Sequence, residues 1–197
     1  MENETMYTFY AFMNRMKLIQ RWNLMRSNIK EDLMQHSASV AIFGQALGII
    51  RNTLFGGNVN VDKIASLALY HDTAEVVSGD LPTPVKYYNA GIKGAYSEIE
   101  QAINKRLLDS LPDELRGAYE SYIEPDEESE EYKIMKIADK LSAYIKCAEE
   151  RLLGNREFDK AFGRLQKVLD ETKKDYPELA YFLDNFMDGF NSSLDIL

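Results

Sequence analysis

Apolar residues recur at three- and four-residue spacing along most of this chain, which is the pattern of helices that bury one face. No run alternates between apolar and polar residues for long enough to predict a strand. The spacing predicts helical regions over residues 9–19, 40–50, 64–77, 99–111, 134–153 and 182–194. The pattern therefore predicts an all-α fold.

Polar breaks separate the helical regions. Glycines at 56–57 follow the second region, and a segment with glycine and two prolines, 79–84, follows the third, because these residues disfavour a continued helix. Pro112 indicates a new helix start, and the acidic residues within 124–131 suit the N-terminus of another helix, which Gly154 closes. Since neither a repeat nor a low-complexity linker is present, residues 1–197 are expected to form one domain.

The composition is that of a folded globular protein, since 45% of the 197 residues are hydrophobic and 11% are aromatic. The formal net charge of −9 argues against a nucleic-acid polymer as partner, because phosphate backbones bind clustered Lys and Arg. It does not argue against a small phosphorylated substrate, which a bound cation and one or two basic residues can hold.

Cys147 is the only cysteine, so an intrachain disulfide and a thiolate metal cluster are both ruled out. This cysteine usage fits a reduced, cytoplasmic setting. The acidic start of the chain lacks the basic and apolar parts of a signal peptide. Apolar stretches such as residues 64–70 are shorter than the roughly 20 residues that cross a bilayer, so we expect no membrane segment.

The chain has only two histidines, His36 and His71, and Asp72 and Glu75 follow the second one. On a helix with about 100° per residue, Glu75 lies about 40° and Asp72 about 100° from His71. Ile64 of the apolar stripe falls in the same sector, so these ionisable groups face a partly buried surface, where unpaired charge is costly. A divalent cation would satisfy them together.

Two further residues complete a candidate ligand set. Asp32 and Gln35 resemble a relaxed capping box, which places His36 in the first turn of a helix, where its imidazole can face a neighbouring helix. Asp139 lies inside an otherwise apolar helical pattern, beside the small residue Ala143. Two imidazoles and two carboxylates suit a transition metal with positions left open for water and substrate.

Each of these residues also has a simpler structural interpretation. An isolated histidine on an apolar face is more often a hydrogen-bonded core residue than a ligand. The dipeptide His71-Asp72 is by itself a weak signal, and Asp139 could be a buried salt-bridge partner of Lys136 or Lys140. The combination of His, His-Asp and Asp on three separate helices is much more specific.

The pattern of His36, His71-Asp72 and Asp139 resembles that of the HD-domain metal-dependent phosphohydrolases. A closer likeness, to the bacterial HD-domain 5′-deoxynucleotidases, runs in register from about Phe9 to the C-terminus. It is carried by Arg21-Trp22, Gln35-His36-Ser37, Phe55-Gly56-Gly57-Asn58-Val59-Asn60, Tyr70-His71-Asp72 and Gly79-Asp80-Leu81-Pro82-Thr83-Pro84-Val85-Lys86-Tyr87. The Gly-Asp-Leu-Pro-Thr-Pro segment is specific within the superfamily, whereas the bare His-Asp dipeptide is not.

The resemblance implies a single-domain HD-type helical bundle that forms a homodimer and hydrolyses deoxyribonucleoside 5′-monophosphates with a divalent metal such as Co2+ or Mn2+. It implies that the metal is held by His36, His71, Asp72 and Asp139, and that Glu75 is the acid/base residue, with Asp72 also in the catalytic centre. The substrate contacts that it implies are Arg21, Trp22, His36, Asp72, Asp80, Leu81, Pro82, Thr83 and Asp139. Gln35 is a departure, because Glu is common before the first histidine; this changes a charge near the site and puts little else in doubt.

The chemistry of three of these residues fits the implied reaction. Glu75 could take a proton from an attacking water or supply one to the leaving 5′ oxygen, and orienting His71 is its structural alternative. Arg21 offers paired N–H donors to phosphate. Trp22, the only tryptophan, would fill the space beside the sugar C2′ and exclude a ribose hydroxyl, although in isolation it would be taken for a core residue.

Two other functions compete with this interpretation. One is a different HD-type enzyme, such as a cyclic-nucleotide phosphodiesterase or a deoxynucleoside triphosphate hydrolase, although binuclear forms need more than the two histidines present. The other is a non-catalytic, metal-stabilised helical binding module. Glu75 and Arg21 argue against that module, because a purely structural metal site needs neither.

Overall fold

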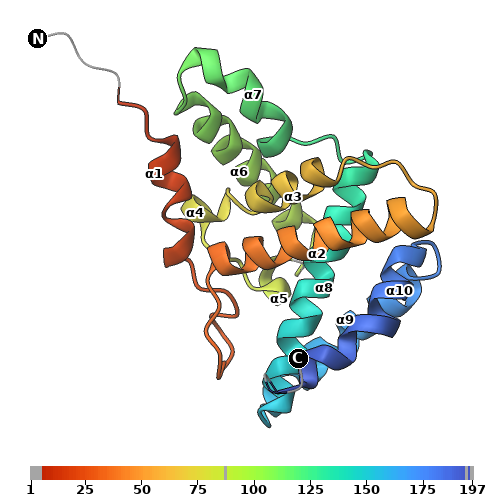
Figure 1. Ribbon diagram of the computed structural model, residues 1–197. Helices are drawn as coiled ribbons and strands as arrows, with labels where there is room; N and C mark the ends of the chain where they lie inside the picture. Colours follow the sequence, from red (N-terminus) through yellow and green to blue (C-terminus); the bar gives the residue numbers. More distant parts are fainter. Residues whose placement is uncertain (1–5, 87, 194, 196–197) are drawn as a thin grey trace, which may run out of the picture.

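The computed structural model describes residues 6–86, 88–193 and 195. Its regular structure is helical (Figure 1), and within those ranges no strand is found beyond an isolated antiparallel bridge between Gln20 and Asp32. The prediction of an all-α fold is confirmed. In chain order the elements are α1 (Phe9–Met13), η1 (Met16–Leu18), α2 (Leu33–Leu54), α3 (Val61–Tyr70), α4 (Glu75–Ser78), α5 (Thr83–Lys86), α6 (Ala90–Asp109), α7 (Asp113–Ile123), α8 (Glu130–Leu152), η2 (Arg156–Phe158), α9 (Asp159–Thr172), α10 (Pro177–Phe186) and η3 (Met187–Asn191).

Side-chain caps fix where the long helices begin. The Asp32 carboxylate accepts a hydrogen bond from Gln35 N at 2.8 Å, and the Gln35 side chain accepts one from Asp32 N at 3.0 Å. The predicted capping box is therefore confirmed, and it starts α2 so that His36 lies in its first turn. The side chains of Asn60 and Ser129 cap α3 and α8 by accepting hydrogen bonds from Lys63 N and Tyr132 N, without the return bond of a capping box.

The predicted continuous helix over residues 64–77 is wrong. Helix α3 ends at Tyr70, and α4 begins only at Glu75, with turns between them. The Thr73 hydroxyl and the Thr73 backbone N–H both donate to the Tyr70 carbonyl, at 2.9 and 3.2 Å. Such bonds compete with the helical ladder, and the chain tightens into three-residue turns. His71 and Asp72 therefore lie in a turn between two helices, and the angles of a continuous helix do not describe them.

Two other predicted helical regions are divided in the structure, and one helix was not predicted. Region 9–19 is split between α1 and η1, and region 182–194 ends its α-helix at Phe186, followed by η3. Helix α9 was not predicted, although Phe162, Leu165 and Leu169 repeat at helical spacing. Residue 194 lies outside the described part of the chain.

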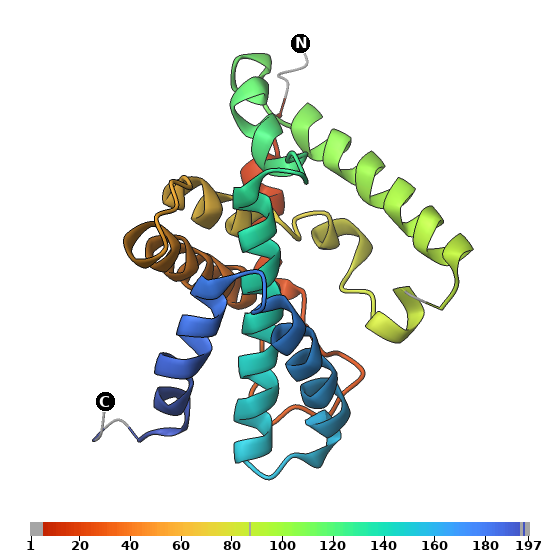
Figure 2. The same cartoon turned by 90° about the vertical axis from the view of Figure 1, so that its right-hand side faces the viewer.

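Helices α2, α3 and α8 pack together to form the main core. Figure 1 shows α2 crossing α8, and Figure 2 shows α9 lying along the C-terminal half of α8. Gly44 permits the close approach, because a Cβ atom there would lie 2.8 Å from Cγ2 of Ile64 in α3 and 3.5 Å from Cβ of Ala138 in α8. The helices that contain His36 and Asp139, and the helix that ends just before His71, thus meet at one glycine.

Helix α2 contains a longer apolar stretch than residues 64–70. By length and composition alone it could cross a membrane, but half of its most apolar stretch is buried inside the protein. The core helix of a soluble protein has the same properties. Its packing against α3 and α8 accounts for that apolar stretch.

Candidate active site

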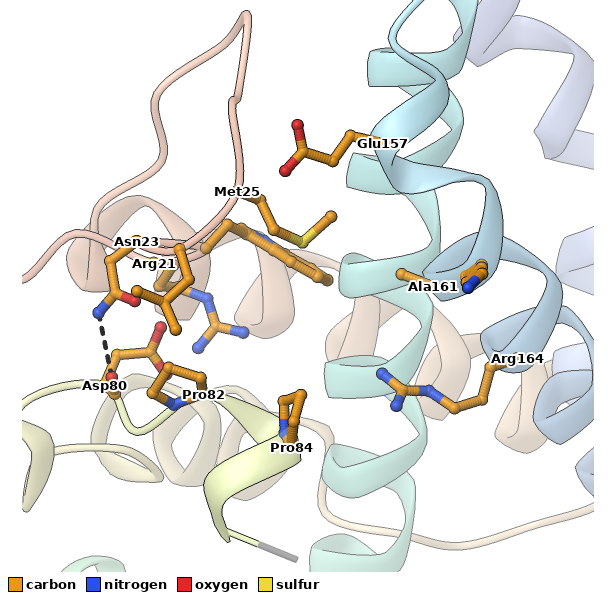
Figure 3. A pocket seen from close by; sticks show the side chains of 12 residues that line it. Arg21, Asn23, Met25, Asp80, Pro82, Pro84, Glu157, Ala161 and Arg164 are labelled. Atoms are coloured by element: carbon orange, nitrogen blue, oxygen red, sulfur yellow. Dashed lines mark hydrogen bonds between the residues drawn. The ribbon is translucent and has the colours of Figure 1, made fainter. Parts of the chain in front are cut away.

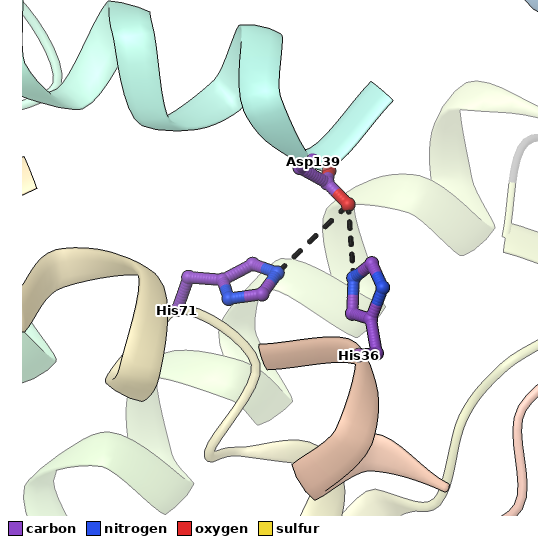
Figure 4. Close-up of side chains that lie close together, drawn as sticks. All are labelled: His36, His71 and Asp139. Atoms are coloured by element: carbon purple, nitrogen blue, oxygen red, sulfur yellow. Dashed lines mark hydrogen bonds and ion pairs between the residues drawn. The ribbon is translucent and has the colours of Figure 1, made fainter. Parts of the chain in front are cut away.

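Three elements bring His36, His71 and Asp139 to one point (Figure 4). His36 comes from the first turn of α2, His71 follows the last residue of α3, and Asp139 lies in the middle of α8. Oδ1 of Asp139 lies 3.1 Å from Nε2 of His36 and 3.9 Å from Nε2 of His71. The candidate ligand atoms of these three residues all lie within 4.8 Å of one another.

Asp72 reaches the same point from the turn after α3. Its Oδ2 atom lies 3.0 Å from Nε2 of His71 and 3.9 Å from Nε2 of His36. The structure thus brings together all four residues that the resemblance implied as metal ligands. Two imidazole nitrogens and two carboxylates form a donor set that suits a divalent transition metal.

The orientation of His71 also fits a metal ligand. Its Nδ1 lies 2.7 Å from the carbonyl oxygen of Ala68, so the Nδ1–H tautomer donates there and leaves Nε2 with a free lone pair. In that tautomer the buried Nε2 lone pair faces carboxylate oxygens, the nearer being Oδ2 of Asp72 at 3.0 Å, and acceptors that face one another are costly to bury. A cation at this point would satisfy all of them.

The charges at the cluster favour a cation. Burial raises the pKa of Asp139, but its hydrogen bond with His36 and the charge of Lys136 outweigh burial and hold that pKa well below the ordinary value. The pKa of Asp72 is likewise lowered, because the charge and hydrogen bond of His71, when its Nε2 carries a proton, outweigh burial. Burial, then the charge of Arg21, lower the pKa of His36. At neutral pH the site therefore combines two carboxylates with a neutral His36.

Asp139 also forms the salt bridge with Lys136 that its simpler structural interpretation predicts. Its second oxygen, Oδ2, lies 3.5 Å from Nζ of Lys136, one turn earlier on α8. The carboxylate thus contacts a lysine with one oxygen and the imidazole of His36 with the other. The salt bridge leaves Oδ1 facing the two histidines.

Glu75 is a buried carboxyl group beside the cluster, at the start of α4 and only 8% exposed. Burial, then the negative charges of Asp72 and Asp80, raise its pKa to about 9. Its Oε2 atom has no hydrogen-bond partner among the described residues. A cavity of about 250 Å3, lined also by His71 and Asp72, reaches Glu75. The group can therefore hold a proton at neutral pH next to the candidate ligands.

Arg21 connects the cluster to the loop that precedes α2. Its Nη1 lies 3.3 Å from Oδ2 of Asp72, and its Nε lies 3.4 Å from Oε2 of Glu31. The neighbouring Trp22 donates from Nε1 to the same Glu31 oxygen at 3.1 Å, and its ring packs against Phe158 with centroids 5.3 Å apart. Both predicted substrate residues therefore contact a glutamate that the sequence analysis did not single out.

A cavity of about 520 Å3 opens on this side of the cluster (Figure 3). One wall contains Arg21, Trp22, Asp80 and Pro82, which the resemblance implied as substrate contacts. Asn23 Nδ2 donates to the Asp80 carbonyl at 3.2 Å, which joins the two loops that form this wall. Leu81 is not among the lining residues, and the side chain of Thr83 lies outside the described part of the structure.

Helix α8 anchors the loop that carries Arg21 and Trp22. The buried Glu150 carboxylate accepts hydrogen bonds from the backbone N–H groups of Asn28 and Ile29, both at 2.9 Å, and from Lys146 Nζ at 2.6 Å. Burial alone would raise the pKa of Glu150, but these hydrogen bonds, led by that of Lys146, lower it to about 2. The loop is thus tied to the helix that provides Asp139.

A family model described as YfbR-like 5′-deoxynucleotidase matches residues 8–190. The chain belongs to the YfbR-like 5′-deoxynucleotidase family. The resemblance predicted from the sequence motifs is confirmed, and the protein is a hydrolase.

Curated relatives and solved structures agree with this family. The 5′-deoxynucleotidases of Vibrio atlanticus and Vibrio cholerae are each 47% identical to the chain, covering 95% of it and 96% of their own length. The crystal structure of an HD-domain phosphohydrolase from Listeria innocua superposes with a TM-score of 0.82 at 23% identity, over 96% of this chain and 90% of that one. A cyanophage S-2L HD phosphohydrolase bound to dA and one catalytic Zn2+ ion has a TM-score of 0.64 at 18% identity, over 91% and 96%. These likenesses show the HD-domain fold.

The motifs of the YfbR-like 5′-deoxynucleotidase family did not reveal the opposite wall of the large cavity. Glu157, Lys160 and Arg164, from η2 and α9, also line the cavity, and Figure 3 shows Glu157 and Arg164 across from Asn23 and Pro82. They lie more than 130 residues from Trp22 in a helix that was not predicted. The helical spacing within α9 would have revealed that helix, but no local pattern indicates which element faces Trp22.

Proposed function

We propose that this protein hydrolyses deoxyribonucleoside 5′-monophosphates to the deoxyribonucleoside and inorganic phosphate. The observation that carries the proposal is the convergence of His36, His71, Asp72 and Asp139 beside the buried carboxyl of Glu75. The names of the relatives support the choice of substrate. The cyanophage protein, whose structure holds dA and one catalytic Zn2+ ion, supports a single-metal site.

His36, His71, Asp72 and Asp139 hold one divalent ion, for which Co2+ and Mn2+ are the expected choices. When bound, this ion supplies positive charge against the phosphate oxygens and lowers the pKa of a water. The protein's own part is to orient the imidazoles, as Ala68 does through the Nδ1–H of His71, and to keep both carboxylates charged. His36, Asp72 and Asp139 also face the reacting phosphate.

Glu75 is the acid/base residue. Its pKa of about 9 keeps a proton on the carboxyl at neutral pH, which suits a group that protonates the leaving 5′ oxygen. A cation at the neighbouring ligands would lower that pKa and bring it closer to neutrality. Its unpaired Oε2 atom is free to exchange the proton with substrate or water.

Arg21 and Trp22 bind the nucleotide at the large cavity. The Arg21 guanidinium, held against Asp72, faces the phosphate from the side of the ligands. The indole of Trp22 lies against the sugar, where it leaves no space for a 2′-hydroxyl. Asp80, Leu81, Pro82 and Thr83 form the facing loop, in which the Asp80 carboxylate accepts from the sugar.

The second chain of a homodimer covers an apolar groove of about 670 Å3 between α2 and the C-terminal elements α10 and η3. Ile42, Ile49 and Phe186, all at this groove, are 66%, 50% and 47% exposed, and an exposed apolar patch of this kind marks an interaction surface. Ile42→Asp should convert a dimer to a monomer in analytical ultracentrifugation. A wild-type protein that sediments as a monomer would exclude this assembly.

We also propose that residues 1–197 form one domain and that the protein acts in the cytoplasm.

A substrate panel tests the activity. Deoxyribonucleoside and ribonucleoside 5′-monophosphates are incubated with the Co2+- or Mn2+-loaded protein, and released phosphate is measured. We expect release from the deoxyribonucleotides, and its absence from all of them would reject the proposal. Cyclic nucleotides and deoxynucleoside triphosphates belong in the same panel, because preferential turnover of either would indicate a different HD-type activity.

A further inference from the structure

Trp22 has an unusual backbone conformation. Its φ angle of 55° lies in the left-handed region, which within the described part of the chain is otherwise occupied by glycines. A bulky residue adopts this conformation only where its surroundings enforce it. The contacts that enforce it at Trp22 therefore determine where the indole lies.

The loop that carries Trp22 is closed at its base. The backbone N–H of Arg21 donates to the Glu31 carbonyl at 3.0 Å, and that of Leu33 donates to the Ile19 carbonyl at 2.9 Å. These bonds place residue 31 directly opposite residue 21, next to Trp22. Glu31 is thereby held in position by its own backbone before its side chain makes any contact.

The Glu31 side chain reaches across the base of the loop to the indole. Its Oε2 accepts from Trp22 Nε1 at 3.1 Å and lies 3.4 Å from Nε of Arg21, and the carboxylate is only 14% exposed. Phe158 packs against the indole but does not fix the rotation of the ring in its plane. A hydrogen bond to Nε1 does fix that rotation, and a partly buried carboxylate makes it a strong one.

We infer that Glu31 is a positioning residue that holds the Trp22 indole in the nucleotide cavity and thereby sets the discrimination between deoxyribose and ribose. The inference rests on the proposed function for its catalytic consequence, but the placement of the indole can be tested without turnover. Glu31 itself does not line the cavity. It acts on the sugar only through Trp22.

Trp22 is the only tryptophan, so intrinsic fluorescence reports on this side chain alone. Three variants separate size, charge and hydrogen bonding. Glu31→Gln keeps an acceptor oxygen at the same reach, Glu31→Leu keeps the bulk without an acceptor, and Glu31→Asp keeps the charge but withdraws it by one methylene. Glu128→Gln, which alters an exposed carboxylate paired with Lys133, is the matched control.

Acrylamide quenching of Trp22 and the ratio of kcat/KM for dAMP over AMP are measured for each folded variant. We expect Glu31→Leu and Glu31→Asp to raise the quenching constant of Trp22. We expect both to lower the kcat/KM ratio of dAMP over AMP by about tenfold, because the free energy of one hydrogen bond to a charged group corresponds to a change of this size. Glu31→Gln should show a smaller change in the same direction, because its neutral oxygen accepts a weaker hydrogen bond than the carboxylate, and the control should stay within about twofold of wild type.

Wild-type quenching in both Glu31→Leu and Glu31→Asp would overturn the inference. A quenching constant in Glu31→Gln as high as that in Glu31→Leu would also overturn the inference. Quenching would then depend on the charge at residue 31 and not on the hydrogen bond to Trp22. If Glu31→Leu does not fold by circular dichroism, Glu31→Asp alone decides. A wild-type protein without nucleotidase activity would reject the proposed function, while the quenching measurements would still test the placement of Trp22.

Discussion

The Nε2 atom of His36 lies 3.1 Å from Oδ1 of Asp139, although 103 residues separate them in the sequence. This contact depends on the packing of α2 against α8, and it joins the members of the candidate ligand set that come from these two helices. A substitution at Asp139 removes a candidate ligand without disturbing the capping box of α2.

Asp139→Asn should release the metal and abolish activity. The amide keeps the shape of the side chain but loses the negative charge that the site offers to a cation. Changes to groups that only support metal ligands cost about 10–100-fold, so we expect a loss of at least about 100-fold. Metal content by mass spectrometry and phosphate release from dAMP check this, with the exposed Asp170→Asn as control. Full metal occupancy in Asp139→Asn would contradict its role.

Glu75→Gln should keep the metal and lose turnover. Loss of a general acid or base lowers the rate by about 10²–10⁴-fold. If Glu75 donates the proton, activity requires its protonated form, so kcat/KM of the wild type falls as pH rises through its pKa. That pKa is about 9, and a bound cation places the falling limb at or below this pH. A rate that rises across the same range would instead identify Glu75 as a base.

Trp22→Ala should raise activity on ribonucleotides relative to deoxyribonucleotides. Removing the indole opens space for a 2′-hydroxyl, and exclusion of this kind contributes about tenfold or somewhat more. The measurement is the ratio of kcat/KM for AMP over dAMP, with the exposed aromatic Tyr10→Ala as control. An unchanged ratio would mean that the indole does not face the sugar.

The local signals in the sequence predicted more of this site than of its surroundings. The capping box at Asp32 correctly placed His36 in a first turn, because a cap depends on residues three apart. The helical wheel around His71 failed, because the Thr73 hydroxyl competes for a backbone carbonyl and ends the periodicity on which the wheel depends. The ligands nevertheless converge, since the turn points His71 and Asp72 to the same place.

Contacts between distant elements could not be predicted in this way. Glu31 has no distinguishing neighbours in sequence, and its role becomes visible only where the loop closes on Trp22. The wall formed by Lys160 and Arg164 depends on how α9 packs along α8. These relationships are set by tertiary packing, which periodicity and motif spacing do not report.

Gly44→Ala should destabilise the protein. The added Cβ would lie 2.8 Å from Cγ2 of the buried Ile64, a β-branched side chain with little freedom to move. Overpacking of this kind costs about 1–3 kcal/mol. Gly117→Ala in α7 is the control, because its Cβ meets nothing within 4 Å and alanine favours a helix. Thermal unfolding of both variants checks this, and equal melting temperatures would contradict the close approach.

Glu150 should make the free energy of unfolding decrease at acidic pH. Its folded pKa of about 2 lies below its ordinary value of 4.5, so its contribution is complete above about pH 4.5 and is lost as pH falls towards 2. The shift corresponds to at most about 3 kcal/mol. Glu150→Gln should lower stability at neutral pH and flatten the acid limb of the unfolding free energy, whereas the exposed Glu171→Gln should not. An unchanged acid limb in Glu150→Gln would contradict the shift.

Asp139 and Glu150 lie eleven positions apart on one helix, α8. At about 1.5 Å per residue, α8 fixes a distance of roughly 16 Å along its axis between the candidate reaction centre and the anchor of the loop that carries Trp22. Adding or deleting a single residue between them would turn the anchor by about 100° and dismantle the loop while sparing the ligands. Substrate choice could therefore be lost separately from metal binding, by a change in the spacing of a helix and without altering any residue that touches either.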